Sequence, residues 1–457
     1  MSAIPSQTLN SSLIRRFNTL LWSSLISNKR LGQEMRHTER HDDRSEFKRD
    51  YDRLIFSAPF RRLQNKTQVF PLPGSIFVHN RLTHSLEVAS VGMSLGNDVE
   101  SALRERGEFD YAPSLGTIVA TACLAHDMGN PPFGHSGEKA IQAFFSEGEG
   151  LSLKDTLTQA TWNDITHFEG NANAFRLLTH RFRGRREGGF VMTYSTLASI
   201  VKYPYISSQC TPEHPKFGFF HTEQATYQKI ANELGLLRPD GSAMRHPLVY
   251  LVEAADDICY EIMDIEDSHK LGLLSTEKTL DLLLRFFDEK AQKDILDRIE
   301  REHIEDYNEQ VVYLRASVIG KLENECAAAF LRHEAEILQG TFQGSLIEHI
   351  SPREREAYSE CSKVAFRHIY KSKPVLDIEL GGYNIIETLL QRLTHAVINP
   401  DRFYSKQLLS RVSSQYEIDA PDIDTRIMAV LDFISGMTDV FALDFYQKIN
   451  GTSLPIV

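Results

Sequence analysis

The stretch LGTIVATACLAHDMGNPPFGH, residues 115–135, combines an apolar run with an abrupt stop. Its apolar first half carries no charged side chain, which predicts a helix buried in a core. Gly129 and the two prolines that follow end this helix, because glycine and proline interrupt helical structure. We therefore expect the adjacent His126 and Asp127 to lie at the end of a packed helix, where a rigid element can aim them.

Two more segments supply side chains of the same kind. His84 lies in the segment NRLTHS, and Asp256 lies in the segment EAADDICY. With His126 and Asp127 they offer two imidazoles and two carboxylates, a ligand set for a divalent cation. The chain contains 17 His and 62 Asp plus Glu residues, so a His-Asp dipeptide alone is weak evidence and the surrounding pattern has to support the interpretation.

A helix is predicted around Asp256, because apolar residues recur every three or four positions over residues 247–263. Asp256 lies beside the apolar face, and a buried carboxylate needs a metal or another cation as its partner. Asp257 is the neighbouring alternative, and a capping or solvated aspartate is a second one. Asp256 is preferred because Tyr260 and Asp264 follow it at four-residue steps on the same helical stripe.

The composition indicates a large globular protein. The chain has 457 residues, 42% of them hydrophobic, which is enough for a large core in two or three lobes. Its net charge of −12 excludes a uniformly basic nucleic-acid binder but leaves room for a local basic groove. Five cysteines without close pairing predict reduced, mostly buried thiols and a cytoplasmic location. No segment resembles a signal peptide or a membrane span, so we expect no membrane partner.

Helical periodicity dominates the rest of the chain, and alternating strand-like runs are scarce. Residues 85–99 and 310–338 each place apolar side chains on one helical face. We predict an almost all-α fold, with at most a short β-hairpin that pairs residues 69–70 with residues 77–78 around a turn at residues 71–74.

Four motifs carry a family resemblance: FRRLQNKTQVF at 60–70, NPPFGH at 130–135 within the first stretch, EGNA at 169–172 and KYP at 202–204. Together with the three segments above, they resemble the bacterial deoxyguanosinetriphosphate triphosphohydrolase family, a group of HD-domain metal-dependent phosphohydrolases. The resemblance covers roughly residues 45–270. We expect three parts: an N-terminal extension over 1–45, an HD-domain helical catalytic core over 46–270 and a helical C-terminal lobe over 271–457.

The family cleaves a deoxynucleoside triphosphate (dNTP) to the deoxynucleoside and inorganic tripolyphosphate. The resemblance thus implies metal-dependent hydrolysis of dGTP and of other dNTPs. The triphosphate carries about four negative charges, so the site needs a divalent cation and several positive side chains. We expect His84, His126, Asp127 and Asp256 to hold that cation. These donors suit Mn²⁺, Fe²⁺, Co²⁺, Ni²⁺ or Zn²⁺, and they admit Mg²⁺ when the nucleotide supplies oxygens.

His135 follows the metal pair by one loop and is the candidate for protonating the leaving 5′-oxygen or for orienting the attacking water. The resemblance makes it the catalytic histidine and makes Glu138 the carboxylate that orients it. Arg81 precedes His84 by three residues, so a helix start would place both on one side, with the guanidinium reaching a phosphate. A surface arginine is the alternative.

Selection of the substrate is assigned to a second group of residues. Gln68 offers a donor and an acceptor, which suits a base edge, and in the family the matching pair of Gln68 and Val69 lies against the base. By resemblance, Tyr260 packs on the sugar and Asp264 accepts its 3′-hydroxyl, and a tight aromatic wall there excludes ribonucleotides. The remaining candidate contacts to phosphate or sugar are Asn130, Lys202 and Tyr203.

The sequence is also compatible with two other functions. One is another HD phosphohydrolase that acts on a nucleoside monophosphate or a guanosine second messenger, and the other is a non-catalytic sensor of nucleotides or nucleic acid. The resemblance also implies a homo-oligomer, often a hexamer, and an allosteric nucleotide or single-stranded DNA as further ligands. The basic run Arg181 to Arg186 is either such a contact or a solvated loop.

Overall fold

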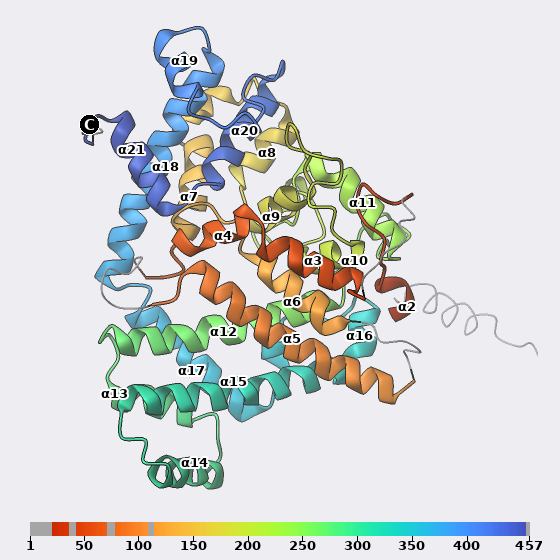
Figure 1. The fold of residues 1–457 in the computed structure, drawn as a ribbon, viewed down its shortest axis with the longest axis vertical. Coiled ribbons are helices and arrows are strands. Elements are labelled where there is room, and N and C mark those ends of the chain that lie inside the picture. Colours follow the sequence, from red (N-terminus) through yellow and green to blue (C-terminus); the bar gives the residue numbers. More distant parts are fainter. Residues whose placement is uncertain (1–20, 36–42, 71–77, 108–113, 454–457) are drawn as a thin grey trace, which may run out of the picture.

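The computed structural model describes residues 21–35, 43–70, 78–107 and 114–453. Within these residues it contains twenty α-helices and no β-strand, so the predicted all-α fold is confirmed (Figure 1). Three isolated β-bridges, including one between Thr67 and Asn80, are the only extended pairings among them. The turn expected at residues 71–74 and most of the hairpin around it lie outside the described residues.

The first eleven helices lie between residues 22 and 270. They are α2 (Trp22–Leu25), α3 (Glu46–Ile55), α4 (Ala58–Arg62), α5 (Arg81–Glu105), α6 (Leu115–His126), α7 (Gly134–Ser146), α8 (Gln159–Thr166), α9 (Gly170–Thr179), α10 (Tyr194–Ile200), α11 (Gln224–Glu233) and α12 (Leu248–Lys270). The later helices are α13 (Thr276–Leu284), α14 (Glu289–Arg301), α15 (Tyr307–Arg332), α16 (Glu334–Leu338), α17 (Pro352–His368), α18 (Lys373–Ile398), α19 (Phe403–Leu409), α20 (Ile423–Ser435) and α21 (Asp439–Ile449).

Helix α6 is the centre of the molecule. Its residues from Leu115 to Ala125 are almost all inaccessible to solvent, and it ends at His126, as the glycine and prolines beyond it predict. Helices α5, α3, α10 and α12 all pack on it, and α5 makes the most extensive of these contacts. Helix α12 continues to Lys270, seven residues past the end that its apolar periodicity predicts at residue 263.

Two hydrophobic clusters make up the interior. The larger one joins α3, α5, α6, α10, α12, α15 and α17. The smaller one joins α7 and α8 to α18, α20 and α21, which lie together in the upper part of Figure 1. The helices after residue 271 pack against the earlier ones in several places, among them α15 on α5 and α12, α17 on α12, and α18 on α7.

The five cysteines, all within the described residues, are free, and four of them are buried, as expected for reduced thiols. None of the described helices has the length and apolar character needed to span a lipid bilayer.

Glycines allow α5 and α6 to approach closely. A Cβ atom on Gly96 of α5 would lie 2.6 Å from Cα of Gly116 on α6, and one on Gly92 would lie 2.6 Å from Sγ of Cys123. Gly320 of α15 is a contrasting case, because a Cβ there meets no described atom within 4 Å.

We expect Gly96→Ala to destabilise the protein by about 1–3 kcal/mol, because the new methyl group would have to push two helix backbones apart. Gly320→Ala is the matched control and should be neutral or stabilise by about 0.5–1 kcal/mol, because alanine restricts the unfolded chain in an open helical position. Urea unfolding followed by circular dichroism measures both. Equal midpoints for the two variants would contradict the proposed role of the helix contact.

Candidate active site

Three helices bring the metal-binding candidates together. His84 lies in the first turn of α5, His126 is the last residue of α6, and Asp256 lies within α12. One donor atom from each of these side chains lies within 4.8 Å of the other two, so the cluster could hold a metal ion. Oδ1 of Asp256 is 3.1 Å from Nε2 of His84 and 3.5 Å from Nε2 of His126.

The orientation of His126 fits a metal ligand. Its Nδ1 lies 2.5 Å from the carbonyl oxygen of Cys123, one turn earlier in α6. An N–H at Nδ1 that donates to this carbonyl leaves the lone pair of Nε2 directed at the cluster. That Nε2 atom is buried and has no hydrogen-bond partner among the described residues. A metal ion would satisfy it.

The electrostatics of the cluster also favour a cation. Burial opposes the charged form of His126, yet the carboxylates of Asp127 and Asp256 raise its pKa to about 9. The side chain of Asp256 is half-buried: 38% of its surface is accessible, on the side of the cavity. Burial opposes its ionisation as well, but the imidazoles of His126 and His84 hold its pKa well below the usual range. These carboxylates require nearby positive charge, which a divalent cation would supply.

Asp127 lies beside the three converging donors and has other partners. Its Oδ2 is 2.8 Å from a guanidinium nitrogen of Arg81, and its Oδ1 accepts a hydrogen bond of 2.5 Å from the side-chain amide of Asn130. Nε2 of His126 is 3.6 Å from Oδ1 of Asp127. Arg81 itself is buried, with 6% exposed, which excludes the alternative of a surface arginine.

His135 and Glu138 form a hydrogen-bonded pair at the start of α7. Nδ1 of His135 is 2.6 Å from Oε2 of Glu138, and the imidazole is 79% exposed in the cavity. Glu138 is buried, and its Oε1 accepts the backbone N–H of Gly170 at 2.8 Å. A Cβ at Gly170 would lie 2.1 Å from Oδ1 of Asn130, so a larger residue there would displace the Asn130 side chain. The carboxylate is therefore held on one side and orients the imidazole on the other.

One cavity of about 440 Å³ contains most of these groups. The sequence-predicted residues that line it are Gln68, Val69, Arg81, His126, Asp127, Asn130, His135, Glu138, Lys202, Asp256 and Tyr260. The cavity thus brings a metal-binding cluster, a histidine–carboxylate pair and cationic side chains into one space.

Three predicted residues lie away from the cavity wall. His84 is buried behind Asp256. Tyr203 lines a neighbouring cavity of about 800 Å³, which shares Lys202 with the first. Asp264 is buried and its Oδ2 accepts a hydrogen bond of 2.7 Å from the Tyr370 hydroxyl; burial raises the pKa of this carboxyl well above its usual range.

Several lining residues are absent from the sequence prediction. Glu169 and Asn171 belong to the EGNA motif, so the sequence contained a pattern from which their place in the site could have been predicted. Tyr370 follows α17, and its ring stacks on Tyr260 with centroids 6.0 Å apart. Lys216 comes from an irregular segment. No local pattern marks these last two positions, because only the tertiary fold brings them to the cavity.

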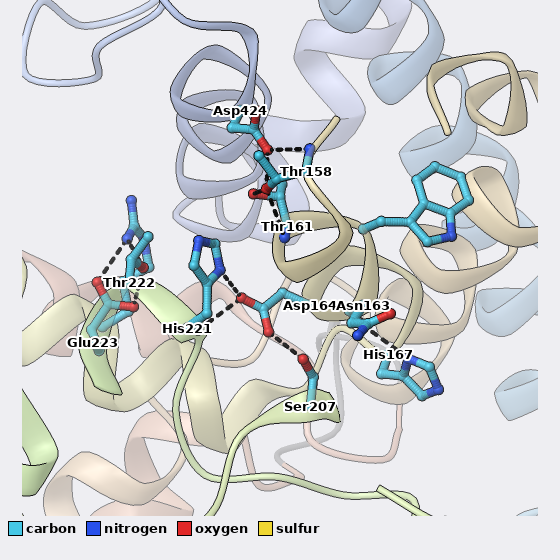
Figure 2. Close-up of polar contacts among 12 residues, drawn as sticks. Thr158, Thr161, Asn163, Asp164, His167, Ser207, His221, Thr222, Glu223 and Asp424 are labelled. Carbon is cyan, nitrogen blue, oxygen red and sulfur yellow. Dashed lines mark hydrogen bonds and ion pairs between the residues drawn. The ribbon is translucent and has the colours of Figure 1, made fainter. Parts of the chain in front are cut away.

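The segment that carries Lys216 is closed by one buried carboxylate, Asp164 of α8. Figure 2 shows this side chain between Ser207 and His221. Its Oδ1 accepts from the Ser207 hydroxyl at 2.5 Å, and its Oδ2 accepts from the backbone N–H and from Nδ1 of His221 at 2.9 and 2.6 Å. The loop between residues 207 and 221 is thereby held at both ends, so Lys216 is presented to the cavity from an anchored segment.

Lys202 is already paired in this structure. Its Nζ lies 2.7 Å from Oε1 of Glu253, while Oε2 of Glu253 is 2.7 Å from Arg245. Burial opposes the charged form of Lys202, but Glu253 raises its pKa above the usual range. Lys202 is thus a permanent cation at the edge of the cavity.

The fold and this site define a class of protein. Residues 81–170 match the HD domain, and residues 349–448 match the phosphohydrolase-associated domain. The first match begins at Arg81 and ends at Gly170, so it spans the His-Asp pair and the His135–Glu138 pair. The protein is an HD-domain phosphohydrolase.

Relatives that match over most of the chain identify the family within this class. The chain is 37% identical to a deoxyguanosinetriphosphate triphosphohydrolase-like protein of Pseudomonas aeruginosa, over 95% of this chain and 99% of that protein. It is 38% identical to a protein of the same description from Synechocystis, over 95% of this chain and all of the relative. A deoxyguanosinetriphosphate triphosphohydrolase of Yersinia enterocolitica is 29% identical over 88% of this chain. The chain therefore belongs to the deoxyguanosinetriphosphate triphosphohydrolase-like family.

We expect Asp256→Asn to weaken metal binding by more than about tenfold, because the amide removes the charge between the two imidazoles. Asp257→Asn is the matched control: its side chain is not among the converging donors, so it should keep the wild-type metal content. Metal analysis by mass spectrometry after equilibration with Mn²⁺ measures both. Full metal retention in Asp256→Asn together with loss in Asp257→Asn would transfer the ligand role to Asp257.

Proposed function

We propose that the protein hydrolyses dNTPs, dGTP among them, to the deoxynucleoside and inorganic tripolyphosphate. The observation that supports this most directly is the single cavity that contains the metal-binding cluster, the His135–Glu138 pair and the cations Arg81, Lys202 and Lys216. The activity for which the relatives are named agrees with such a site.

In this proposal His84, His126, Asp127 and Asp256 hold a divalent ion, with Mn, Fe, Co, Ni, Zn and Mg all compatible with their donor atoms. When bound, the ion supplies positive charge that stabilises the developing negative charge at the phosphate under attack. Asp127 and Asn130 contact each other at the edge of this cluster, so Asn130 orients the carboxylate and lies near the phosphate end of the cavity.

His135 acts on the leaving group. The bond that breaks joins the α-phosphorus to the 5′-oxygen of the sugar, and the oxygen has to gain a proton as it leaves. Glu138 accepts the N–H at Nδ1 of His135, which directs Nε2 into the cavity. An imidazole held in this way can donate a proton from Nε2 to the 5′-oxygen. Water supplies the new bond to phosphorus, and the products are the deoxynucleoside and tripolyphosphate.

The cationic side chains bind the triphosphate. Arg81 is oriented by Asp127, and Lys202 by Glu253, so both are already in place before substrate arrives. Lys216 reaches the cavity from the anchored loop. Three cations along one cavity can contact more of the charged oxygens of a triphosphate than of a monophosphate, which favours a triphosphate.

The base and the sugar occupy the other end of the cavity in this proposal. Gln68 and Val69 contact the base, and Tyr260 packs against the sugar. Asp264 acts indirectly. It accepts a hydrogen bond from the hydroxyl of Tyr370, and the ring of Tyr370 stacks on Tyr260. Tyr203 supports Lys202 from the neighbouring cavity, with the ammonium 5.8 Å from its ring centroid.

We also propose a cytoplasmic homo-oligomer. The free thiols fit a reducing compartment. Exposed aromatic side chains on the C-terminal helices, among them Phe403 at 82% and Phe441 at 42%, fit an interface between copies. Light scattering coupled to size exclusion tests the assembly, and a monomer at micromolar concentration would contradict it.

We expect His135→Ala to lower kcat by about 10²- to 10⁴-fold, because the leaving oxygen loses its proton donor. The side chain is exposed, so bound metal and the melting temperature should remain those of the wild type. Steady-state kinetics on dGTP, metal analysis and thermal denaturation measure the three quantities. A variant with undiminished kcat would exclude His135 as the acid, whereas absence of turnover in the wild type as well would support a non-catalytic nucleotide sensor.

A screen of the four dNTPs and the four ribonucleotides, alone and in mixtures, tests the substrate class. We expect tripolyphosphate from dNTPs and little from ribonucleotides, because in this proposal the stacked rings of Tyr260 and Tyr370 form an aromatic wall against the sugar that excludes a 2′-hydroxyl. Ion chromatography separates tripolyphosphate from pyrophosphate and orthophosphate. Release of only orthophosphate or pyrophosphate would instead indicate a different HD phosphohydrolase. Turnover only in mixtures would indicate an activating nucleotide site.

A further inference from the structure

Asp439, the first residue of α21, connects the C-terminal helices to two segments of the cavity wall. Its side chain is buried. Oδ2 accepts the backbone N–H of Thr67 at 2.8 Å, and Oδ1 accepts the backbone N–H of Phe133 at 2.9 Å. These partners lie 372 and 306 residues earlier in the chain. Both oxygens of one carboxylate are therefore used to hold backbone amides from distant segments.

Each of these amides directly precedes residues of the cavity. Thr67 is followed by Gln68 and Val69, which line the wall. Phe133 is separated from His135 by one glycine, and it begins the turn from which α7 starts. Its backbone is left-handed, with φ of 61°, a conformation that is costly for a residue other than glycine. A charge-assisted hydrogen bond to its N–H helps to hold this turn in place.

Lys66 also links the C-terminal helices to the cavity wall. Its buried Nζ donates to the carbonyl of Asn130 at 2.5 Å and to the carbonyl of Ser435 at 2.8 Å. The loop from Asn130 to Phe133 is thus held at one end by Lys66 and at the other by Asp439. The attraction between Lys66 and Asp439 also offsets part of the cost of burying each charge.

Helix capping does not explain the hydrogen bonds that the Asp439 carboxylate accepts. Thr438 is the N-cap of α21, and its hydroxyl already accepts the N–H of Phe441. Both carboxylate oxygens of Asp439 point away from its own helix, toward the two cavity segments. The arrangement is therefore specific to the connection between the C-terminal helices and the cavity.

We propose that Asp439 is a positioning residue, which sets the place of His135 through Phe133 and the place of the Gln68–Val69 wall through Thr67. The inference rests on the proposed function, because it assigns to Asp439 an effect on the step that His135 performs. It makes the phosphohydrolase-associated region a contributor to the catalytic geometry, although Asp439 touches no substrate.

The first test combines Asp439→Asn with His135→Ala in a double-mutant cycle on dGTP hydrolysis. Asp439→Asn should lower kcat by about 10- to 100-fold with metal content unchanged, because a small misplacement of the acid is enough for such a loss. In the His135→Ala background the same substitution should change kcat by less than about twofold, because the acid through which it acts on kcat is gone, whereas the Gln68–Val69 wall acts on substrate binding and KM. Asp444→Asn, on the exposed side of the same helix and paired with Lys448, is the matched control and should keep wild-type kinetics.

Independent losses that multiply in the double variant would overturn the proposal, because Asp439 would then act on turnover by another route. Asp439→Glu covers the case in which the Asn variant folds poorly. It keeps the charge but moves the carboxylate by one methylene, so it should show the same dependence on His135.

The second test is hydrogen–deuterium exchange, which does not need turnover. Peptides that cover residues 66–70 and 131–138 should exchange at least about tenfold faster in Asp439→Asn than in the wild type or in Asp444→Asn. Unchanged exchange in both peptides would overturn the proposal even if kcat fell. A wild-type protein that hydrolyses no dNTP would contradict the proposed function, and the exchange measurement would then decide separately whether Asp439 holds the two segments.

Discussion

Close packing of α5 against α6 is the constraint on which the candidate active site depends. The two helices run antiparallel, since Gly96 meets Gly116 while His84 and His126 lie together at the opposite end, with ring centroids 5.4 Å apart. At the Gly96–Gly116 crossing the backbones approach within a distance that a single methyl group would prevent. Helix α12 then packs on both, and Asp256 faces the two imidazoles. The donor cluster is therefore a consequence of core packing rather than of any loop.

Charge is balanced pairwise around this cluster. Arg81 faces Asp127, and Lys202 faces Glu253, so these two positive groups are paired before a ligand arrives. Such pairing lowers the cost of burying each charge and holds the side chains in one orientation. An incoming polyphosphate would share these cations with their carboxylate partners. The same principle operates at Asp439, where a buried carboxylate compensates Lys66 and orders two backbone segments at once.

Features that depend on nearby residues were predictable. The apolar run and the glycine-proline stop located α6, and the pairing of His135 with Glu138, which the family resemblance implied, is present at the start of α7. The helical periodicity of apolar residues predicted solvent exposure less reliably. Leu86 belongs to the helical segment predicted to carry one apolar face, but it is 44% exposed. Asp264 shares a helical stripe with Asp256, yet it faces Tyr370 rather than the cavity, because a neighbour from another part of the chain covers it.

The sequence by itself determined the all-α character and the candidate metal donors, and the family resemblance implied the pairing of His135 with Glu138. The helices follow from interactions across one or two helical turns, which residue spacing records directly. Only the tertiary structure decided that Asp127 pairs with Arg81, that Tyr370 and Lys216 join the cavity wall, and that Asp439 holds Thr67 and Phe133. Such contacts join residues up to 372 positions apart, and no local pattern encodes them, because they arise only when the whole core packs.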